Sequence, residues 1–94
     1  MYRREAVVRS REGLHTRPAM EFVRRAEAFQ AEIWLGRVGD EMRYSAKSTI
    51  RLLALGLSQG ERVLLTAAGS DEREAVDTLA ALLECEAEYA AQRK

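Results

Sequence analysis

The sequence has very little cysteine, histidine or proline, and it has no long apolar run. With a single cysteine, Cys85, the 94-residue chain cannot form an internal disulfide. One histidine and one cysteine are too few for the side-chain clusters that hold zinc, so we expect no metal ion and no cofactor. No stretch approaches the roughly 18 apolar residues that a membrane-spanning helix needs. We therefore expect a soluble protein that does not insert into a membrane.

Neither sign of charge dominates. The 15 lysines and arginines balance the 15 aspartates and glutamates, and the formal net charge is zero. This balance gives no general attraction to nucleic acid or to an anionic membrane surface. The basic residues Arg3 and Arg4 are not followed by an apolar segment, so we expect no signal peptide. Together these features predict a protein of the reducing cytoplasm.

The length is that of one small domain, which we expect to span residues 1–94. Alternating apolar residues predict four strands, at residues 2–9, 31–36, 41–45 and 61–67. Apolar residues at helical spacing predict three helices, at residues 16–29, at residues 49–55 and after residue 71. The order β-α-β-β-α-β-α predicts an α+β fold with helices on one face of a sheet. We expect residues 86–94 to overhang the core.

Several residues are typical of helix ends. Ser48 is expected to cap the start of the second helix, and Gly56 fits the position just past its end. Asp71, followed three residues later by Glu74, predicts a capping box at the start of the third helix.

The first two predicted helices share an exposed surface. The second carries too many apolar residues for a single buried stripe, so we expect Ile50 and Leu53 to be exposed. On the first helix, three side chains lie opposite the apolar stripe and should also face solvent: Arg17, Met20 and Arg24.

The only histidine and the only proline of the chain stand together in residues 13–18, between the first strand and the first helix. Pro18 suits a first helical turn, where its missing N–H group costs nothing. This places His15 beside the N-terminus of the helix. Gly13 allows a tight bend before it.

The chemistry of this stretch favours phosphoryl transfer. A neutral imidazole is a competent nucleophile near pH 7, because its ordinary pKa is about 6.5. The free amides of a helix N-terminus bind phosphate, so those of Thr16 and Arg17 could hold a phosphoryl group on His15. The Arg17 guanidinium adds a bidentate donor. From these residues alone, a histidine that is only a poor helix cap remains the alternative.

Two stretches resemble motifs of a known family. The active-site signature of the HPr family, the histidine-containing phosphocarriers of the bacterial phosphoenolpyruvate-dependent phosphotransferase system, closely resembles Gly13-Leu14-His15-Thr16-Arg17-Pro18-Ala19. The regulatory-serine segment of the family and its helix resemble Ala46-Lys47-Ser48-Thr49-Ile50 and Leu52-Leu53-Ala54-Leu55-Gly56. The resemblance covers residues 2–85 and includes the spacing between the motifs.

The resemblance implies an open-faced β-sandwich, in which a four-stranded antiparallel sheet carries three helices on one face. It implies that His15 accepts a phosphoryl group at Nδ1 from phosphorylated enzyme I and passes it to an EIIA-type domain, with Arg17 as the phosphate partner. The chain would then be a relay in sugar uptake and not an enzyme. Both partners would dock on the exposed residues of the first two helices, namely Arg17, Met20, Arg24, Ile50 and Leu53. We expect a monomer, because a carrier needs this face free.

Ser48 has two interpretations. One is the helix cap described above. The other, implied by the resemblance, is a regulatory site phosphorylated by HPr kinase/phosphorylase, where added negative charge would weaken docking to enzyme I. Thr49 and Arg51 stand where regulated members usually carry an aliphatic residue and often a glycine, so both interpretations stay open.

Two other functions remain open at this point. One is the nitrogen-related branch of the same family, which signals without transporting sugar. The other is a small regulatory binding module, because the order of elements also fits ferredoxin-like domains. The binding module predicts no role for His15.

Overall fold

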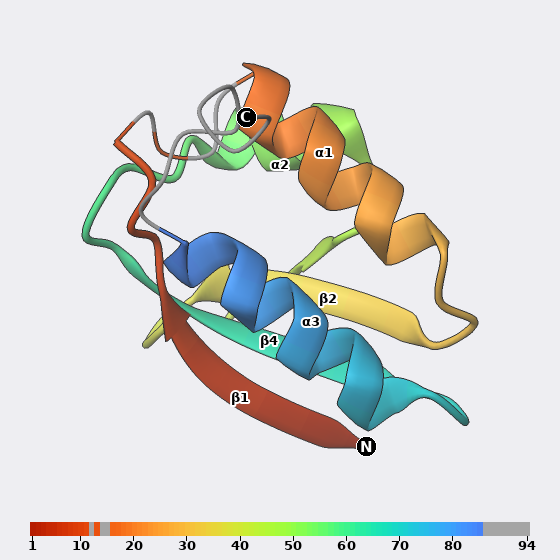
Figure 1. Cartoon of the computed structure of the whole chain (residues 1–94). Helices are drawn as coiled ribbons and strands as arrows, with labels where there is room; N and C mark the ends of the chain where they lie inside the picture. The colour runs from red at the N-terminus through yellow and green to blue at the C-terminus, as the bar shows by residue number, and fades with distance from the viewer. Residues whose placement is uncertain (12, 14–15, 86–94) are drawn as a thin grey trace.

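The computed structural model describes residues 1–11, 13 and 16–85. These residues form four strands and three helices in the predicted order (Figure 1). The elements are β1 (Tyr2–Val7), α1 (Thr16–Glu27), β2 (Glu32–Arg37), β3 (Tyr44–Ser45), α2 (Thr49–Leu55), β4 (Arg62–Ala68) and α3 (Glu72–Glu84). The predicted strand at residues 41–45 is only two residues long. Residues 86–94, expected to overhang the core, lie outside the described residues.

The strands form one antiparallel sheet in the order β1-β4-β2-β3. The sequence-adjacent strands β2 and β3 form the predicted hairpin, and β4 lies between β1 and β2. Figure 1 shows all three helices on the same side of this sheet. The opposite face is open, and there Thr66 is flanked by Arg3 on β1 and by Trp34 on β2. The predicted two-layer arrangement is confirmed.

The core lies between the sheet and the helices. Strand residues at alternate positions point into it, as the period of two predicts. The buried strand residues are Ala6, Ile33, Leu35, Val63, Leu65 and Ala67. The apolar stripes of α1 and α3 meet them; on α3, Ala80 is fully buried, whereas Leu82 is only partly buried. Burial of this apolar surface is the main driving force for folding.

Arg4 interrupts the apolar pattern of β1 but is accommodated on the helix-covered face. Its Nη1 lies 3.1 Å from Oδ1 of Asp77, and its Nη2 lies 3.9 Å from Oε1 of Glu84. The hydroxyl of Tyr2 donates to the same Asp77 oxygen at 3.0 Å. Acidic residues of α3 therefore hold the edge strand β1 on the helix-covered face of the sheet.

The ends of α2 are capped as the sequence predicts. The hydroxyl oxygen of Ser48 accepts from the backbone N–H of Arg51 at 3.3 Å. Gly56 has the left-handed φ of 63°, and its N–H donates to the carbonyl of Leu52 at 3.3 Å. A residue with a side chain would be strained in this conformation.

The predicted capping box at Asp71 is wrong. Its side chain makes no capping hydrogen bond to α3. Instead, its two carboxylate oxygens accept from the backbone N–H groups of Gln30 and Ala31, each at 2.9 Å. These hydrogen bonds lower the pKa of Asp71, and the bond from the Gln30 backbone has the largest effect. The cause is tertiary: the connection from α1 to β2 brings two N–H groups to this carboxylate, and they replace the helix amide as its donors.

Candidate phosphoryl-transfer site

The predicted site lies at the N-terminal end of α1. His15 itself lies outside the described residues, and Thr16 is the first residue of the helix. Pro18 is buried in the first turn, as predicted, and Arg17 beside it is exposed to solvent. Since α1 begins at Thr16, the residue that precedes the helix is His15. The residues that follow His15 in the chain thus provide a helix N-terminus and an exposed guanidinium, both favourable for an anion.

Gly13, two residues before the histidine, packs against a part of the chain that is distant in sequence. Its φ of 67° is in the left-handed region, which confirms the predicted bend. A Cβ built on it would lie 2.5 Å from the carbonyl oxygen of Leu57 and 3.1 Å from Cα of Ser58. The segment after α2 therefore packs directly on the loop before α1. Sequence reasoning found the bend but not this contact.

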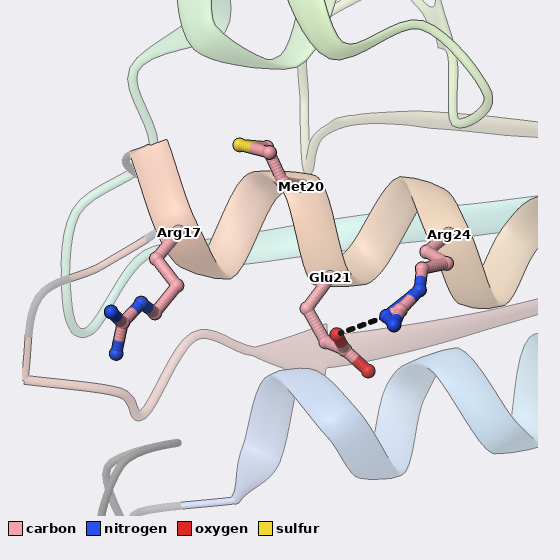
Figure 2. Close-up of a pocket in the computed structure, with 4 residues that line it drawn as sticks. All are labelled: Arg17, Met20, Glu21 and Arg24. Atoms are coloured by element: carbon pink, nitrogen blue, oxygen red, sulfur yellow. Dashed lines mark ion pairs between the residues drawn. The ribbon is translucent and has the colours of Figure 1, made fainter.

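The outer side of α1 is hollowed next to this end. A pocket of about 370 Å³ is lined by Arg17, Met20, Glu21 and Arg24 (Figure 2). Met20 is 56% exposed, although it is apolar. The three residues predicted to face solvent on α1 are thus exposed and lie together. Glu21 was not predicted to belong to this surface.

Helix α2 extends this surface. It packs beside α1 (Figure 1), and its side chains Ile50 and Leu53 are 80% and 40% exposed. We refer to Arg17, Met20, Arg24, Ile50 and Leu53 as the docking surface. Exposed apolar side chains rimmed by basic ones are typical of an interface for acidic partners.

An ion pair between the last residue of β2 and the residue before β4 supports the end of α2. The Arg37 guanidinium binds the Glu61 carboxylate and also donates to the carbonyl of Leu55 at 2.9 Å. Glu61 in turn accepts from the backbone N–H of Ser58 at 3.0 Å. These hydrogen bonds lower the pKa of Glu61, and the bond from Arg37 has the largest effect. They fix the segment on which Gly13 rests.

We expect Glu61→Gln to lower the free energy of unfolding at pH 7 by about 1 kcal/mol, a value reduced for partial exposure of the pair. Because the folded-state pKa of Glu61 is below the ordinary value of 4.5 for a glutamate, the contribution of Glu61 to stability is present above pH 4.5 and is lost as pH falls through the folded-state pKa. Urea unfolding, followed by Trp34 fluorescence at pH 7 and pH 3, measures this.

Glu41→Gln is the matched control, because Glu41 is exposed and forms no ion pair with any residue in the described ranges. A difference between Glu61→Gln and the wild type that stays constant down to pH 3 would contradict the assignment.

Among the residues that the structure describes, no group of three or more histidine, cysteine, aspartate or glutamate side chains could hold a metal ion. Within the same residues, no helix is long and apolar enough to cross a membrane.

The chain matches known proteins over nearly all of the described residues. A family profile described as "PTS HPr component phosphorylation site" matches residues 2–85. The chain belongs to the HPr family of phosphocarrier proteins. The phosphocarrier protein HPr of Haemophilus influenzae is 42% identical over 83 residues, which are 88% of this chain and 95% of the relative. This confirms the family inferred from the two sequence motifs.

Solved HPr structures have the same fold. HPr-C-His from Thermoanaerobacter tengcongensis superposes with a TM-score of 0.83 and 39% identity, covering 89% of this chain and 92% of that one. A phosphocarrier protein HPr from Bacillus anthracis gives a TM-score of 0.82 at 33% identity, covering 87% of this chain and 95% of that one. The open-faced sandwich expected from the sequence is therefore confirmed.

Proposed function

We propose that this HPr-family chain is a phosphoryl relay whose acceptor is Nδ1 of His15. The group would arrive from phosphorylated enzyme I and leave to an EIIA-type domain during phosphoenolpyruvate-dependent sugar uptake. In this role the chain is a stoichiometric carrier and not an enzyme with a small substrate of its own. Since phosphoenolpyruvate is a metabolite of the cytoplasm, the relay would operate there.

One observation carries the proposal: an exposed arginine on the first turn of a 12-residue helix that begins directly after the only histidine. The phosphoryl group brings about two negative charges. The N-terminal amides of α1, including those of Thr16 and Arg17, can donate to its oxygens. The Arg17 guanidinium can bind it with two parallel hydrogen bonds.

The docking surface suits both partners in turn. Arg17 and Arg24 line the same pocket as Met20, and the exposed Ile50 and Leu53 stand on the adjacent helix α2. Basic residues attract an acidic partner and raise its association rate, and the small apolar patch allows rapid release. We further propose that the chain acts as a monomer, because self-association through this surface would block both partners.

The deciding experiment is phosphotransfer with intact-mass detection. The chain is incubated with phosphoenolpyruvate and enzyme I, and we expect a gain of one phosphoryl group that is lost in acid. Adding an EIIA-type domain should remove the group again. No gain, under conditions in which a known HPr is labelled, would disprove the relay.

Ser48 offers a second level of control, and we propose that HPr kinase/phosphorylase phosphorylates it. Its hydroxyl caps α2 two residues before the exposed Ile50. A phosphate at this position would place about two negative charges on the docking surface and repel acidic partners.

We expect Ser48→Glu to raise the KM for phosphorylated enzyme I by about tenfold, through like-charge repulsion. Steady-state phosphotransfer measures this, with Ser48→Gln as the uncharged control. Labelling by the kinase with ATP should disappear in Ser48→Ala. Equal KM values for the Glu and Gln variants would leave Ser48 with the capping role alone.

A further inference from the structure

Helix α1 carries a carboxylate in the middle of its basic outer side. Glu21 lies four residues after Arg17 and four residues before Arg25. Side chains four residues apart lie on the same face of a helix and can form ion pairs. Glu21 could therefore neutralise the arginine nearest the histidine or one farther along the helix.

The structure shows which of these pairs forms. Nε of Arg25 donates to Oε2 of Glu21 at 2.9 Å, and Nη1 of Arg24 lies 3.8 Å from Oε1. Figure 2 shows the Arg17 guanidinium pointing away from Glu21, and Arg24 turned toward it. Arg17 makes no ion pair with any residue in the described part of the chain.

Helix physics explains this preference. A glutamate that precedes its basic partner by four residues forms a better pair than one that follows it. Glu21 precedes Arg25 but follows Arg17. Arg24 supplies a second cation on the same side, and both later arginines lie in the last turn of α1, where the helix dipole favours positive charge.

We propose that Arg24 and Arg25 are positioning residues: their ion pairs with Glu21 keep its carboxylate from Arg17, which stays available to the phosphoryl group. The inference rests on the proposed function, since it gives these two arginines a part in the same site. Without Arg24 and Arg25, Glu21 would turn back to Arg17 and compete with the phosphoryl oxygens for its donors. Exposed pairs of this kind are weak, so the competition should weaken the contact between Arg17 and the phosphoryl group about two- to fivefold.

The main test measures the phosphoryl group directly and needs no protein partner. Phosphoramidate donates the group: its P–N bond breaks, ammonia leaves, and a bond forms from phosphorus to the imidazole nitrogen. Phosphorus-31 NMR then gives the second pKa of the phosphohistidine, which a nearby guanidinium lowers. We expect R24Q/R25Q to raise this pKa by about 0.3–0.7 units, which corresponds to the two- to fivefold loss.

Two controls separate this effect from a general loss of positive charge. R3Q/R43Q removes the same two charges from exposed positions outside the helices, and it should shift the phosphoryl pKa less. Adding Glu21→Gln to R24Q/R25Q should restore the wild-type value. In an Arg17→Gln background, R24Q/R25Q should have almost no effect. An equal shift in that background would overturn the proposal, as would failure of Glu21→Gln to restore the value.

A second measurement tests the ion pairs in the unphosphorylated chain. We expect the side-chain carboxyl carbon-13 signal of Glu21 at pH 7 to move in Arg25→Gln and to stay in place in Arg17→Gln. A signal that moves in Arg17→Gln would show that the carboxylate is shared, and this would contradict the proposal. Neither measurement uses enzyme I, so a chain that fails as a relay can still support or overturn the role of Arg24 and Arg25.

Discussion

Replacement of His15 by alanine is expected to reduce phosphoryl acceptance from enzyme I about a thousandfold or more, to background. The reason is chemical: His15 is the only histidine of the chain, so the variant has no imidazole nitrogen to accept the phosphoryl group. Intact-mass measurement after incubation with phosphoenolpyruvate and enzyme I should show only the unmodified chain. The parallel measurement with an EIIA-type domain should show no transfer.

Arg17→Gln provides the graded comparison for this experiment. It keeps the acceptor nitrogen and removes the guanidinium that would bind the phosphoryl oxygens, so we expect slower acceptance, by about ten- to a hundredfold, and not its loss. Circular dichroism should give the same spectrum for both variants and the wild type. Acid-labile labelling of the His15→Ala chain would exclude His15 as the acceptor.

Gly13→Ala is expected to lower the free energy of unfolding by about 2–4 kcal/mol. Two effects add. Alanine is disfavoured at the φ of 67°, and its Cβ would overlap the backbone oxygen of Leu57, 2.5 Å away. The Leu57 oxygen belongs to the backbone and cannot swing aside as the end of a flexible side chain could. The backbone at residue 13 must therefore move away from the segment after α2. Urea unfolding measures the loss in stability.

Gly39→Ala separates strain from overlap. Gly39 also has a positive φ, 91°, but a Cβ built there meets nothing within 4 Å. We expect this variant to lose only the conformational part, about 1–2 kcal/mol. Because Gly13 precedes the histidine by two residues, Gly13→Ala should also slow phosphoryl acceptance, whereas Gly39→Ala should not. Equal losses in the two variants would show that the contact with Leu57 contributes nothing.

Local patterns predicted the elements of this fold well. The alternation around Ile33 and Leu35 is a property of a strand, whichever strands lie beside it. The stripe through Phe22 and Ala26 likewise depends only on helical geometry. Ser48 and Gly56 act within one or two turns of their own helix, so their capping roles could be predicted. The exposed side chains of the docking surface followed from the same periodicity, because an apolar residue off the buried stripe has no core to enter.

The short third strand shows where such patterns fail. Residues 41–43 lie outside β3, although the sequence predicted a strand from 41 to 45. Strand pairing is decided by neighbouring strands as much as by propensity. Here β2 pairs with Tyr44 and Ser45 and with none of residues 41–43.

The sequence by itself determined the order of elements and was enough to predict His15 as the acceptor and Arg17 as its partner, because each of these depends on residues that are close together in the chain. The tertiary structure decided which distant groups meet. Asp71 binds the amides before β2 and not its own helix, and Arg37 reaches the end of α2. Gly13 packs against Leu57 in the segment that follows α2. The structure also shows that Glu21 pairs with Arg25 and not with Arg17, in agreement with the directional preference of such pairs along a helix.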